Sequence, residues 1–442
     1  MMTLEDYLKR NAEQYADKPA VVCNGATVSY ASLYRKVKQR AGELRQRGVR
    51  EGEGVVMRSS QDVEFLVQYF AIHLAKAVAV PLEKDAPQHR VDEISRLLRD
   101  AEIPAGTADI LFTTGTTGKS KGVMISHRAI VCNAENLIDG QQFTHDLVFV
   151  ICGPLNHIGS LSKIYPVVLL GATLYLLEGM KDLKQFFHAL DYPCKKMATF
   201  LVPTNIRMLL QFGARQLAGY VDKIDFVEAG GAPLPLSDQQ AFCQALPKSR
   251  LYNTYASTET GIISTYNYNN GQPGQPGCLG RPMRHSRVFV TPEGRVACQG
   301  PTLMTGYVGD PGKTAEVLHD DTLFTADNGE INDEGMLILQ GRNDDVINVG
   351  GFKVAPSEVE EVALSFMGVK DCICIAVAHP MLGNALKLLY VPDGDVQVGK
   401  RELARYINAR LESYKVPQLY EQVEQVQRTY NGKLERKFYR TL

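Results

Sequence analysis

The stretch that decides the fold is LFTTGTTGKSKG, residues 111–122, because it places a loop suited to phosphate directly after an apolar run. Few bulky side chains obstruct this loop, so its backbone N–H groups can face a polyphosphate while its hydroxyls donate and its lysines add positive charge. Gly115 and Gly118 supply the backbone freedom that such a turn requires. A Walker A loop is excluded, because it needs four residues between its first Gly and the Gly-Lys pair, and position 113 is Thr. An ordinary Gly/Thr turn is the alternative only for short parts of the stretch.

Residues 113–122 resemble the signature [ST]-[ST]-G-[ST]-T-G-x-P-K-G of the adenylate-forming (AMP-binding) superfamily, which includes acyl- and aryl-CoA synthetases, luciferases and peptide-synthetase adenylation domains. Thr114 stands where Ser is commoner, and Ser120 replaces Pro, which removes a fixed φ angle from the loop. The resemblance implies that this loop binds the phosphates of ATP. The implied contacts are Thr113, Thr114, Gly115, Thr116, Thr117, Gly118 and Lys121.

Composition sets outer limits on the function. The chain has 442 residues, enough for two or three domains, and its net charge of −1 provides no broad basic field for nucleic acid. No apolar run approaches the length of a transmembrane helix, and the charged N-terminus is unlike a signal peptide. The nine cysteines form no CxxC pair and no zinc-spaced cluster. We therefore expect a reduced, cytoplasmic protein without a membrane span.

Alternating strand-like and helix-like segments predict a layered α/β fold. Asn24-Gly25 predicts a hairpin, and the patterns predict helices at about 30–47 and at 160–170. The resemblance implies a large N-terminal domain, residues 1–343, of α/β layers plus a distorted β-barrel. It also implies a small α+β C-terminal lid, residues 344–442, that moves about a hinge at Asp344. Segments 83–107 and 279–300 are shorter than is typical of the superfamily, so we expect a shortened member, with an undetermined oligomeric state.

Three segments resemble the nucleotide-binding motifs of the superfamily: EAGGAPLP (228–235), LYNTYASTET (251–260) and LFTADNGEINDEGMLILQGRNDD (323–345). A stacking ring, an amide and a carboxylate that accepts two ribose hydroxyls suit a nucleotide, and a hard oxygen ligand suits Mg²⁺. Ala256 and Ala326 stand where the motifs have Gly, and a methyl at 256 is costly only if φ is positive there. The implied ATP contacts are Gly230, Gly231, Ala232, Asn253, Tyr255, Thr258, Asp327 and Arg342, with Glu259 as the magnesium ligand.

Three more segments complete the resemblance. TYNGKLERK (429–437) resembles the closing P-K-T-x-x-G-K-x-x-R motif, which makes Lys433 the adenylation lysine, although a solvated surface lysine is the commoner case. Within VINVGGFKV (346–354), Gly350 and Gly351 would let the thin pantetheine arm of CoA pass close to the backbone. GPLNHIGSLS (153–162) makes His157 a candidate gate of the acyl pocket, or a core histidine.

The resemblance implies an acid–thiol ligase that uses ATP, Mg²⁺ and CoA. A carboxylate attacks the α-phosphate of MgATP, Lys433 bridges the two anions, and a thiol then attacks the acyl-AMP. HIGSLS and the short length resemble o-succinylbenzoate–CoA ligases and related aryl-CoA ligases, but a fatty acid remains an alternative. Two further alternatives are an acyl-AMP ligase that loads a carrier protein and a catalytically degenerate nucleotide-binding paralogue. A P-loop kinase or GTPase is disfavoured by the loop spacing.

Overall fold

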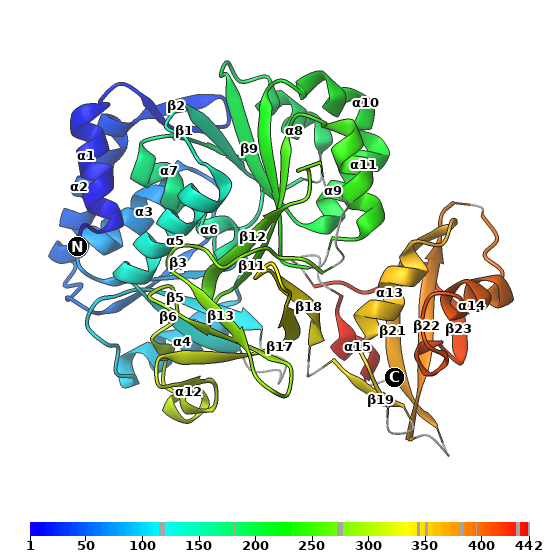
Figure 1. Ribbon diagram of the computed structural model, residues 1–442. Coiled ribbons are helices and arrows are strands. Elements are labelled where there is room, and N and C mark those ends of the chain that lie inside the picture. Colours follow the sequence, from blue (N-terminus) through cyan, green and yellow to red (C-terminus); the bar gives the residue numbers. More distant parts are fainter. Residues whose placement is uncertain are drawn as a thin grey trace.

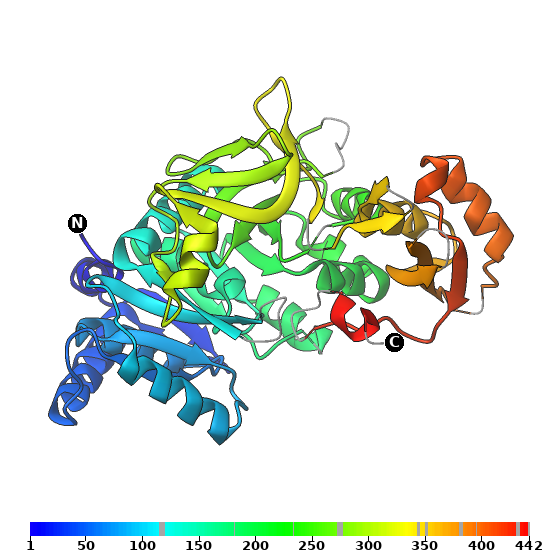
Figure 2. The ribbon, with the colours of Figure 1, turned by 90° about the horizontal axis from the view of Figure 1, so that it is seen from below.

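The computed structural model describes residues 1–114, 120–180, 182–232, 234–271, 277–342, 345–349, 352–379, 383–394, 396–429 and 434–440. Figure 1 shows a large N-terminal domain and a small C-terminal domain, and Figure 2 shows the same two bodies from below. This architecture confirms the predicted α/β fold class. Within the described ranges, no helix has the length and apolar character that crossing a bilayer requires.

An eight-stranded sheet forms the centre of the N-terminal domain, in the order β12-β11-β10-β9-β7-β8-β1-β2. Neighbours from β11 to β1 are parallel, and antiparallel hairpins close both edges. The β1–β2 hairpin turns at Asn24 and Gly25, which both have positive φ, as the Asn-Gly pair predicts. The strands are β1 Pro19–Cys23, β2 Ala26–Ser29, β7 Leu147–Ile151, β8 Thr173–Leu176, β9 Lys196–Leu201, β10 Ile224–Ala229, β11 Arg250–Ser257 and β12 Gly261–Asn267.

Helices cover both faces of this sheet, which is why its parallel strands read as nearly continuous apolar runs. Side chains alternate along β7: Phe149 belongs to the larger apolar cluster, whereas Val148 and Val150 pack in a second cluster on the other face. The larger cluster includes side chains of α1 Leu4–Gln14, α2 Tyr30–Gln46, α3 Val63–Leu74, α5 His127–Gln141 and α7 Ile164–Leu170. The second includes side chains of α8 Leu183–Leu190, α9 Pro203–Phe212, α10 Ala214–Leu217 and α11 Leu236–Ala245, and the 3₁₀ turn Ala218–Tyr220 packs against it.

The single helix predicted at 160–170 is wrong, because the chain forms two helices there, α6 Ile158–Leu161 and α7. Pro166 has no N–H to donate to the carbonyl of Ser162, and its ring would crowd that carbonyl in a continuous helix, so the helix breaks at 162–163 and Pro166 lies in the first turn of α7. Instead, the N–H of Tyr165 donates to the Ser162 carbonyl at 3.3 Å, and α7 begins afresh. The break places the buried side chain of Lys163 beside the central sheet.

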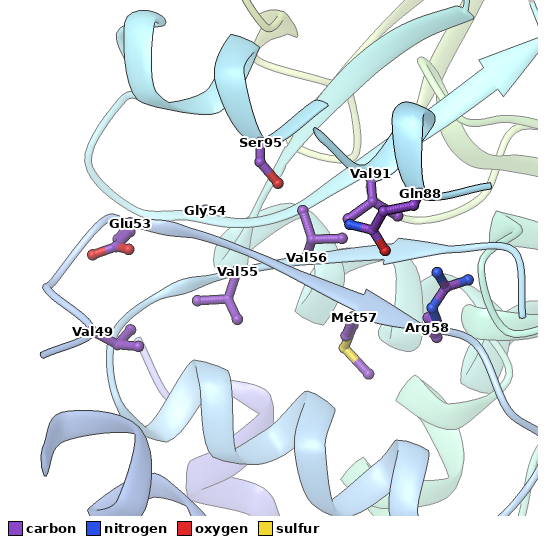
Figure 3. Close-up of a pocket in the computed structure, with 10 residues that line it drawn as sticks. All are labelled: Val49, Glu53, Gly54, Val55, Val56, Met57, Arg58, Gln88, Val91 and Ser95. Atoms are coloured by element: carbon purple, nitrogen blue, oxygen red, sulfur yellow. The ribbon is translucent and has the colours of Figure 1, made fainter. Parts of the chain in front are cut away.

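A second, five-stranded sheet has the order β15-β6-β5-β4-β3. Its strands are β3 Gly54–Arg58, β4 Val78–Leu82, β5 Thr107–Thr114, β6 Ser120–Ser126 and β15 Gly306–Tyr307. From β4 the chain passes through a single helix, α4 Gln88–Asp100, directly into β5, so β3 is left as the edge strand. A pocket of about 410 Å³ lies between β3 and α4, and its lining residues are Val49, Glu53, Gly54, Val55, Val56, Met57, Arg58, Gln88, Val91 and Ser95 (Figure 3). None of these is a predicted site residue.

The region predicted as a distorted barrel is built around a third sheet, β13-β14-β17-β16, with β18 paired to β17. Its strands are β13 Arg287–Val290, β14 Arg295–Gln299, β16 Leu318–His319, β17 Thr322–Ile331 and β18 Leu337–Arg342, and α12 Pro311–Val317 precedes β16. The hairpin β17–β18 sets Asp327 opposite Arg342. This third sheet therefore carries the predicted ribose-binding pair.

The C-terminal domain has its own apolar cluster, which draws on residues from Ile347 to Ile407. Its sheet has the order β21-β22-β23, and β19 and β20 form a separate hairpin. The elements are β19 Ile347–Val349, β20 Phe352–Val354, α13 Pro356–Leu364, β21 Val369–His379, β22 Gly383–Pro392, α14 Lys400–Asn408, a 3₁₀ turn Ser413–Lys415, β23 Leu419–Gln422 and α15 Arg436–Arg440. Figures 1 and 2 both show α15 on the side of this domain that faces the N-terminal domain.

Candidate active site

Three of the predicted motifs lie at the carboxyl edge of the central sheet. Ile151 pairs with Phe200, Leu201 with Ala229, and Ala229 with Asn253, so the parallel strands β7, β9, β10 and β11 end side by side. The segments that follow β7 and β10 carry His157 and Gly230, and β11 itself carries Asn253 and Tyr255. Ligands of open α/β sheets bind at this edge, so the topology brings together residues that lie up to a hundred positions apart in the sequence.

Phe200 lies between the His157 segment and the Gly230 segment. A Cβ atom added at Gly159 would approach its ring to 3.0 Å, and one added at Gly230 would approach it to 2.9 Å. Both glycines are therefore needed for the ring to pack against the backbone. Gly231 follows with a φ of 84°, and Ala232 is half-buried. Phe200 thus joins the predicted acyl gate to the segment predicted to line adenine.

Tyr255, Asp327 and Arg342 form one connected group. The buried phenol of Tyr255 donates to Oδ2 of Asp327 at 2.7 Å, and Arg342 Nη1 lies 3.5 Å from Oδ1. Burial raises the pKa of Tyr255, and the charge of Asp327 raises it further, so the phenol keeps its proton at neutral pH. A carboxylate held in this way is oriented before a ribose arrives, which suits the acceptor role predicted for Asp327.

Asn253 is buried beside this group, and its Nδ2 donates to the Tyr268 phenol at 3.2 Å. Tyr268 in turn donates to the carbonyl of Cys278 at 2.8 Å. The two alanines that replace motif glycines are tolerated, because neither Ala256 nor Ala326 has a positive φ. Their methyl groups therefore give no reason to assign the chain to a degenerate paralogue.

Glu259 and Lys121 meet at the ring of Tyr307. The phenol donates to Oε1 of Glu259 at 3.1 Å, and Nζ of Lys121 lies 5.1 Å from the ring centroid. Burial, and after it the Glu259 carboxylate, raise the pKa of Tyr307 above its usual range, so the phenol remains a donor. Tyr307 belongs to β15, which pairs with β6, and Thr258 and Glu259 lie in the turn between β11 and β12. The predicted magnesium ligand therefore lies beside the predicted phosphate loop.

The phosphate loop itself connects the two strands of a hairpin. Thr113 pairs with Lys121 and Thr114 with Ser120, so the loop begins and ends at the same point of the second sheet. Gly122 must be small, because a Cβ there would lie 2.6 Å from Val308 and 2.9 Å from the ring of Phe112. Several predicted residues lie outside the described residues, namely Gly115, Thr116, Thr117, Gly118, Asp344, Gly350, Gly351 and Lys433.

A buried ion pair lies beside Phe200. Lys163 Nζ is 2.8 Å from Oε1 of Glu228, both side chains are 1% exposed, and the ammonium lies 5.1 Å from the centroid of Phe200. Burial lowers the pKa of Lys163, and the Glu228 charge opposes that shift. His157 is half-buried at the start of α6, and its Nε2 lies 3.5 Å from the Asn156 amide. The structure thus places His157 at the carboxyl edge of the sheet, in the segment that follows β7.

The segment that follows Lys433 is attached firmly to the C-terminal domain. Arg436 donates to both carboxylate oxygens of Glu360 at 2.7 Å, and its Nε lies 3.3 Å from Oδ2 of Asp345. Asp345 directly follows the predicted hinge. A separate contact joins the domains, because Arg207 Nη1 donates to the Lys370 carbonyl at 3.2 Å while the same guanidinium pairs with Asp238.

Sequence reasoning missed Tyr307, Phe200 and the Lys163–Glu228 pair. Each acts on a partner far away in the sequence: Tyr307 lies 48 positions from Glu259, and Lys163 lies 65 positions from Glu228. No local pattern marks such residues. A single tyrosine in a Gly-rich region or a lysine after an apolar helix resembles many surface residues. The Pro at 166 is the one local signal that could have indicated the break that buries Lys163.

Comparison with known proteins identifies similar chains. Residues 8–105 and 103–308 match the family described as AMP-binding enzyme, and residues 358–433 match the AMP-binding enzyme C-terminal domain. A feruloyl-CoA synthase of an Amycolatopsis species is 26% identical, with 96% of each chain covered. A 2-succinylbenzoate–CoA ligase of Staphylococcus epidermidis is 29% identical over 75% of this chain and 69% of that protein.

Among solved structures, ATP-bound MatB from Rhodopseudomonas palustris is 24% identical and superposes with a TM-score of 0.89 over 100% of this chain and 99% of that chain. The two chains therefore share their fold over their whole length. The alignment with the feruloyl-CoA synthase is 486 positions long, although it covers only 96% of this chain's 442 residues. The relative therefore has residues that this chain lacks. That difference agrees with the predicted shortening.

Proposed function

Because this chain belongs to the AMP-binding enzyme family, we propose that it is an ATP-dependent acid–thiol ligase that forms an acyl-AMP and then an acyl-CoA thioester. Family membership confirms the superfamily that residues 113–122 predict. Both curated relatives described above are named as CoA ligases or synthases, which is the same class of activity. The proposal assigns individual roles to the residues of the candidate site.

The observation that carries the proposal is the path of the chain from Tyr255 to Glu259. The Tyr255 phenol forms a hydrogen bond with Asp327, the predicted acceptor of the ribose hydroxyls. Four residues later, Glu259 accepts a hydrogen bond from Tyr307, whose ring lies beside Lys121. One short segment therefore connects a ribose position to a phosphate position. We assign the adenosine of ATP to the Tyr255–Asp327 end and its phosphates to the Glu259–Lys121 end.

In the first step, a carboxylate oxygen of the acid attacks the α-phosphorus of ATP, an acyl–phosphate bond forms, and the bond to pyrophosphate breaks. Both reactants are anions, so the protein must align them and reduce their repulsion. Lys433 supplies an ammonium group between them, while Lys121 and the threonine hydroxyls contact the departing pyrophosphate. The half-buried carboxylate of Glu259 fits Mg²⁺, a hard cation that prefers oxygen ligands, and bound Mg²⁺ would neutralise phosphate charge.

In the second step, the sulfur of CoA forms a bond to the carbonyl carbon of the acyl-AMP, the bond from that carbon to the phosphate oxygen breaks so that AMP leaves, and the thiol proton passes to solvent. Lys433 has no role at the carbonyl in this step, so the C-terminal domain must rotate about Asp344 and present Gly350 and Gly351 to the pantetheine arm. The Arg436–Glu360 pair supports this account, because it ties the segment that follows Lys433 to the C-terminal domain. The nine free thiols support a reducing, cytoplasmic location.

The test is ATP–pyrophosphate exchange measured with a panel of aryl acids, dicarboxylic acids and fatty acids, in wild type and in Lys433→Ala. We expect one class of acid to stimulate exchange and Lys433→Ala to lose at least a hundredfold of it. The class of acid that increases the exchange rate identifies the substrate. Exchange that no acid stimulates would overturn the proposal in favour of a degenerate paralogue, and undiminished exchange in Lys433→Ala would show that the lysine is wrongly assigned.

The acceptor is tested separately, because a carrier protein with a phosphopantetheine arm offers the same thiol as CoA. With the acid found above, we expect CoA to accept the acyl group and to release AMP. Transfer to a carrier protein without transfer to CoA would instead identify an acyl-AMP ligase. An Asp344→Pro variant that keeps exchange but loses thioester formation would support the hinge, and equal loss of both steps would contradict it.

A further inference from the structure

Three side chains from different helices converge at a point that the proposed reaction does not use. Glu5 lies in α1, His73 in α3 and His127 at the start of α5. Oε2 of Glu5 is 4.0 Å from Nδ1 of His73 and 3.9 Å from Nδ1 of His127. The three atoms all lie within 4.8 Å of one another, and the two imidazole rings meet edge to face with centroids 5.1 Å apart.

None of these three atoms has a hydrogen-bond partner among the described residues. The His73 side chain is completely buried, and that of Glu5 is 11% exposed. Buried polar atoms in folded proteins are nearly always satisfied, because leaving one unpaired costs about 1–3 kcal/mol. Three unpaired atoms that surround one point indicate that the point is a binding position for a further atom.

The other nitrogen of His73 is held by a buried carboxylate. Nε2 lies 2.9 Å from Oδ1 of Asp109, and Oδ2 of Asp109 accepts the phenols of Tyr69 at 2.8 Å and Tyr165 at 3.3 Å. With both phenols donating, Asp109 accepts the proton of Nε2–H, so in the neutral imidazole the lone pair of His73 is on Nδ1, the nitrogen nearest Glu5. A carboxylate that orients a histidine in this way is the usual support behind a metal-binding imidazole.

The charge of two buried carboxylates at this point would be balanced by a cation. Glu5 and Asp109 are two buried carboxylates, and within the described residues their ion-pair partners are histidines, with no Lys or Arg within 4.0 Å. A divalent ion bound by Glu5, His73 and His127 would balance both carboxylates while leaving both imidazoles neutral. A water molecule has two hydrogens to donate, so it satisfies all three atoms only when Nδ1 of His127 carries a proton.

We propose that Glu5, His73 and His127 form a binding site for a divalent transition metal of the zinc class. Two imidazoles and a carboxylate are ligands that Zn²⁺ accepts, with a fourth position left for water. A tetrahedral ion with bonds of about 2.1 Å separates its ligands by about 3.4 Å. On binding, Oε2 of Glu5 must therefore approach each histidine nitrogen by roughly 0.5 Å, and the two histidine nitrogens, which lie within 4.8 Å, must approach each other by up to about 1.4 Å. Such an ion ties α1 to α5, whose first residue lies five positions after Gly122 at the base of the phosphate loop.

The test uses the full chain, treated with EDTA and kept free of nucleotide, and titrates it with Zn²⁺ against a chromogenic chelator. We expect one equivalent to bind, and Glu5→Gln and His127→Gln each to weaken binding at least tenfold. Co²⁺ should give the visible absorption of a tetrahedral nitrogen and oxygen site, without the charge-transfer band of a thiolate. Asp109→Asn, which leaves all three ligands in place, should weaken binding about tenfold through the orientation of His73.

Two matched variants separate this site from other metal positions. His89→Gln changes an exposed histidine of α4, and Glu259→Gln changes the predicted magnesium ligand, so both should bind Zn²⁺ as the wild type does. Equal affinity in wild type, Glu5→Gln and His127→Gln would overturn the proposal, and so would a wild type that binds no ion. Melting curves with and without Zn²⁺ check folding, because the ion should raise the melting temperature of wild type but not of a folded His127→Gln protein.

Discussion

The phenol of Tyr307, in strand β15 of the second sheet, donates a 3.1 Å hydrogen bond to Oε1 of Glu259, which follows strand β11 of the central sheet. Its strand, β15, pairs with β6 at the base of the phosphate loop, and Nζ of Lys121 lies over its ring. Tyr307 therefore fixes the distance between the predicted magnesium ligand and the predicted phosphate loop. This makes it a positioning residue for adenylation, although it belongs to none of the motifs that predict the site.

Tyr307→Phe should lower ATP–pyrophosphate exchange at least tenfold and should raise the Mg²⁺ concentration needed for half-maximal rate. A hydrogen bond to a charged group contributes about 1.5–3 kcal/mol, and the variant leaves Glu259 free to turn away from the phosphates. The measurement is exchange at fixed ATP across a Mg²⁺ titration. Tyr266→Phe, which removes a phenol that accepts a hydrogen bond from the exposed Asn270 amide, is the control and should behave as wild type. A Tyr307→Phe enzyme with a reduced rate but an unchanged Mg²⁺ requirement would show that the ring contributes only packing.

Tyr255→Phe should raise the KM for ATP about tenfold, with a smaller effect on kcat at saturating ATP. Removing the phenol leaves Oδ2 of Asp327 without its 2.7 Å donor, so the carboxylate is no longer oriented for the ribose hydroxyls. The check is to compare ATP with 2′-deoxy-ATP in both enzymes. Wild type should discriminate between the two nucleotides more strongly than the variant, and equal discrimination would place the ribose elsewhere.

The elements that local sequence predicts are those fixed by local physics. Asn24-Gly25 predicts a turn because both residues accept positive φ, and the helix expected at about 30–47 is α2 Tyr30–Gln46. The motif at 251–260 likewise predicts that Tyr255 and Glu259 act together, because they lie on one strand and the turn that follows it. For the turn and the helix the decisive interactions lie within a few residues, whereas Tyr255 and Glu259 bond to Asp327 and Tyr307, 72 and 48 positions away.

Interactions between distant segments were not predictable in this way. His73 and Asp109 are 36 positions apart, and neither has a sequence context that distinguishes it from an ordinary core or strand residue. The break between α6 and α7 depends on one proline, whose effect on an otherwise apolar helical pattern is easily overlooked. Only the folded chain shows that this break buries a lysine against Glu228.

Arg207→Ala should change the ratio of the two half-reactions by about fivefold. Nη1 of Arg207 donates to the Lys370 carbonyl in the C-terminal domain, and a hydrogen bond of this kind contributes about 1 kcal/mol. The proposed cycle requires the C-terminal domain to rotate between two positions. Loss of this contact destabilises the domain position seen in the structure, so it should slow the half-reaction that takes place in that position. Exchange and thioester formation from preformed acyl-AMP are measured separately. Equal change in both steps would show that Arg207 affects folding or substrate binding rather than domain position.

Lys163→Met should destabilise the N-terminal domain by about 3–5 kcal/mol, because it leaves the Glu228 carboxylate buried without its 2.8 Å partner. The double variant Lys163→Met, Glu228→Leu should recover most of this loss, since well-packed apolar side chains can replace a buried ion pair at little cost. Denaturant unfolding of both variants gives the comparison. Lys248→Met is the matched control: its pair with Asp222 is 67% and 78% exposed, so its removal should cost about 0.5 kcal/mol or less. A double variant as unstable as Lys163→Met would mean that the pair, and not the burial of one uncompensated charge, holds α7 against the sheet.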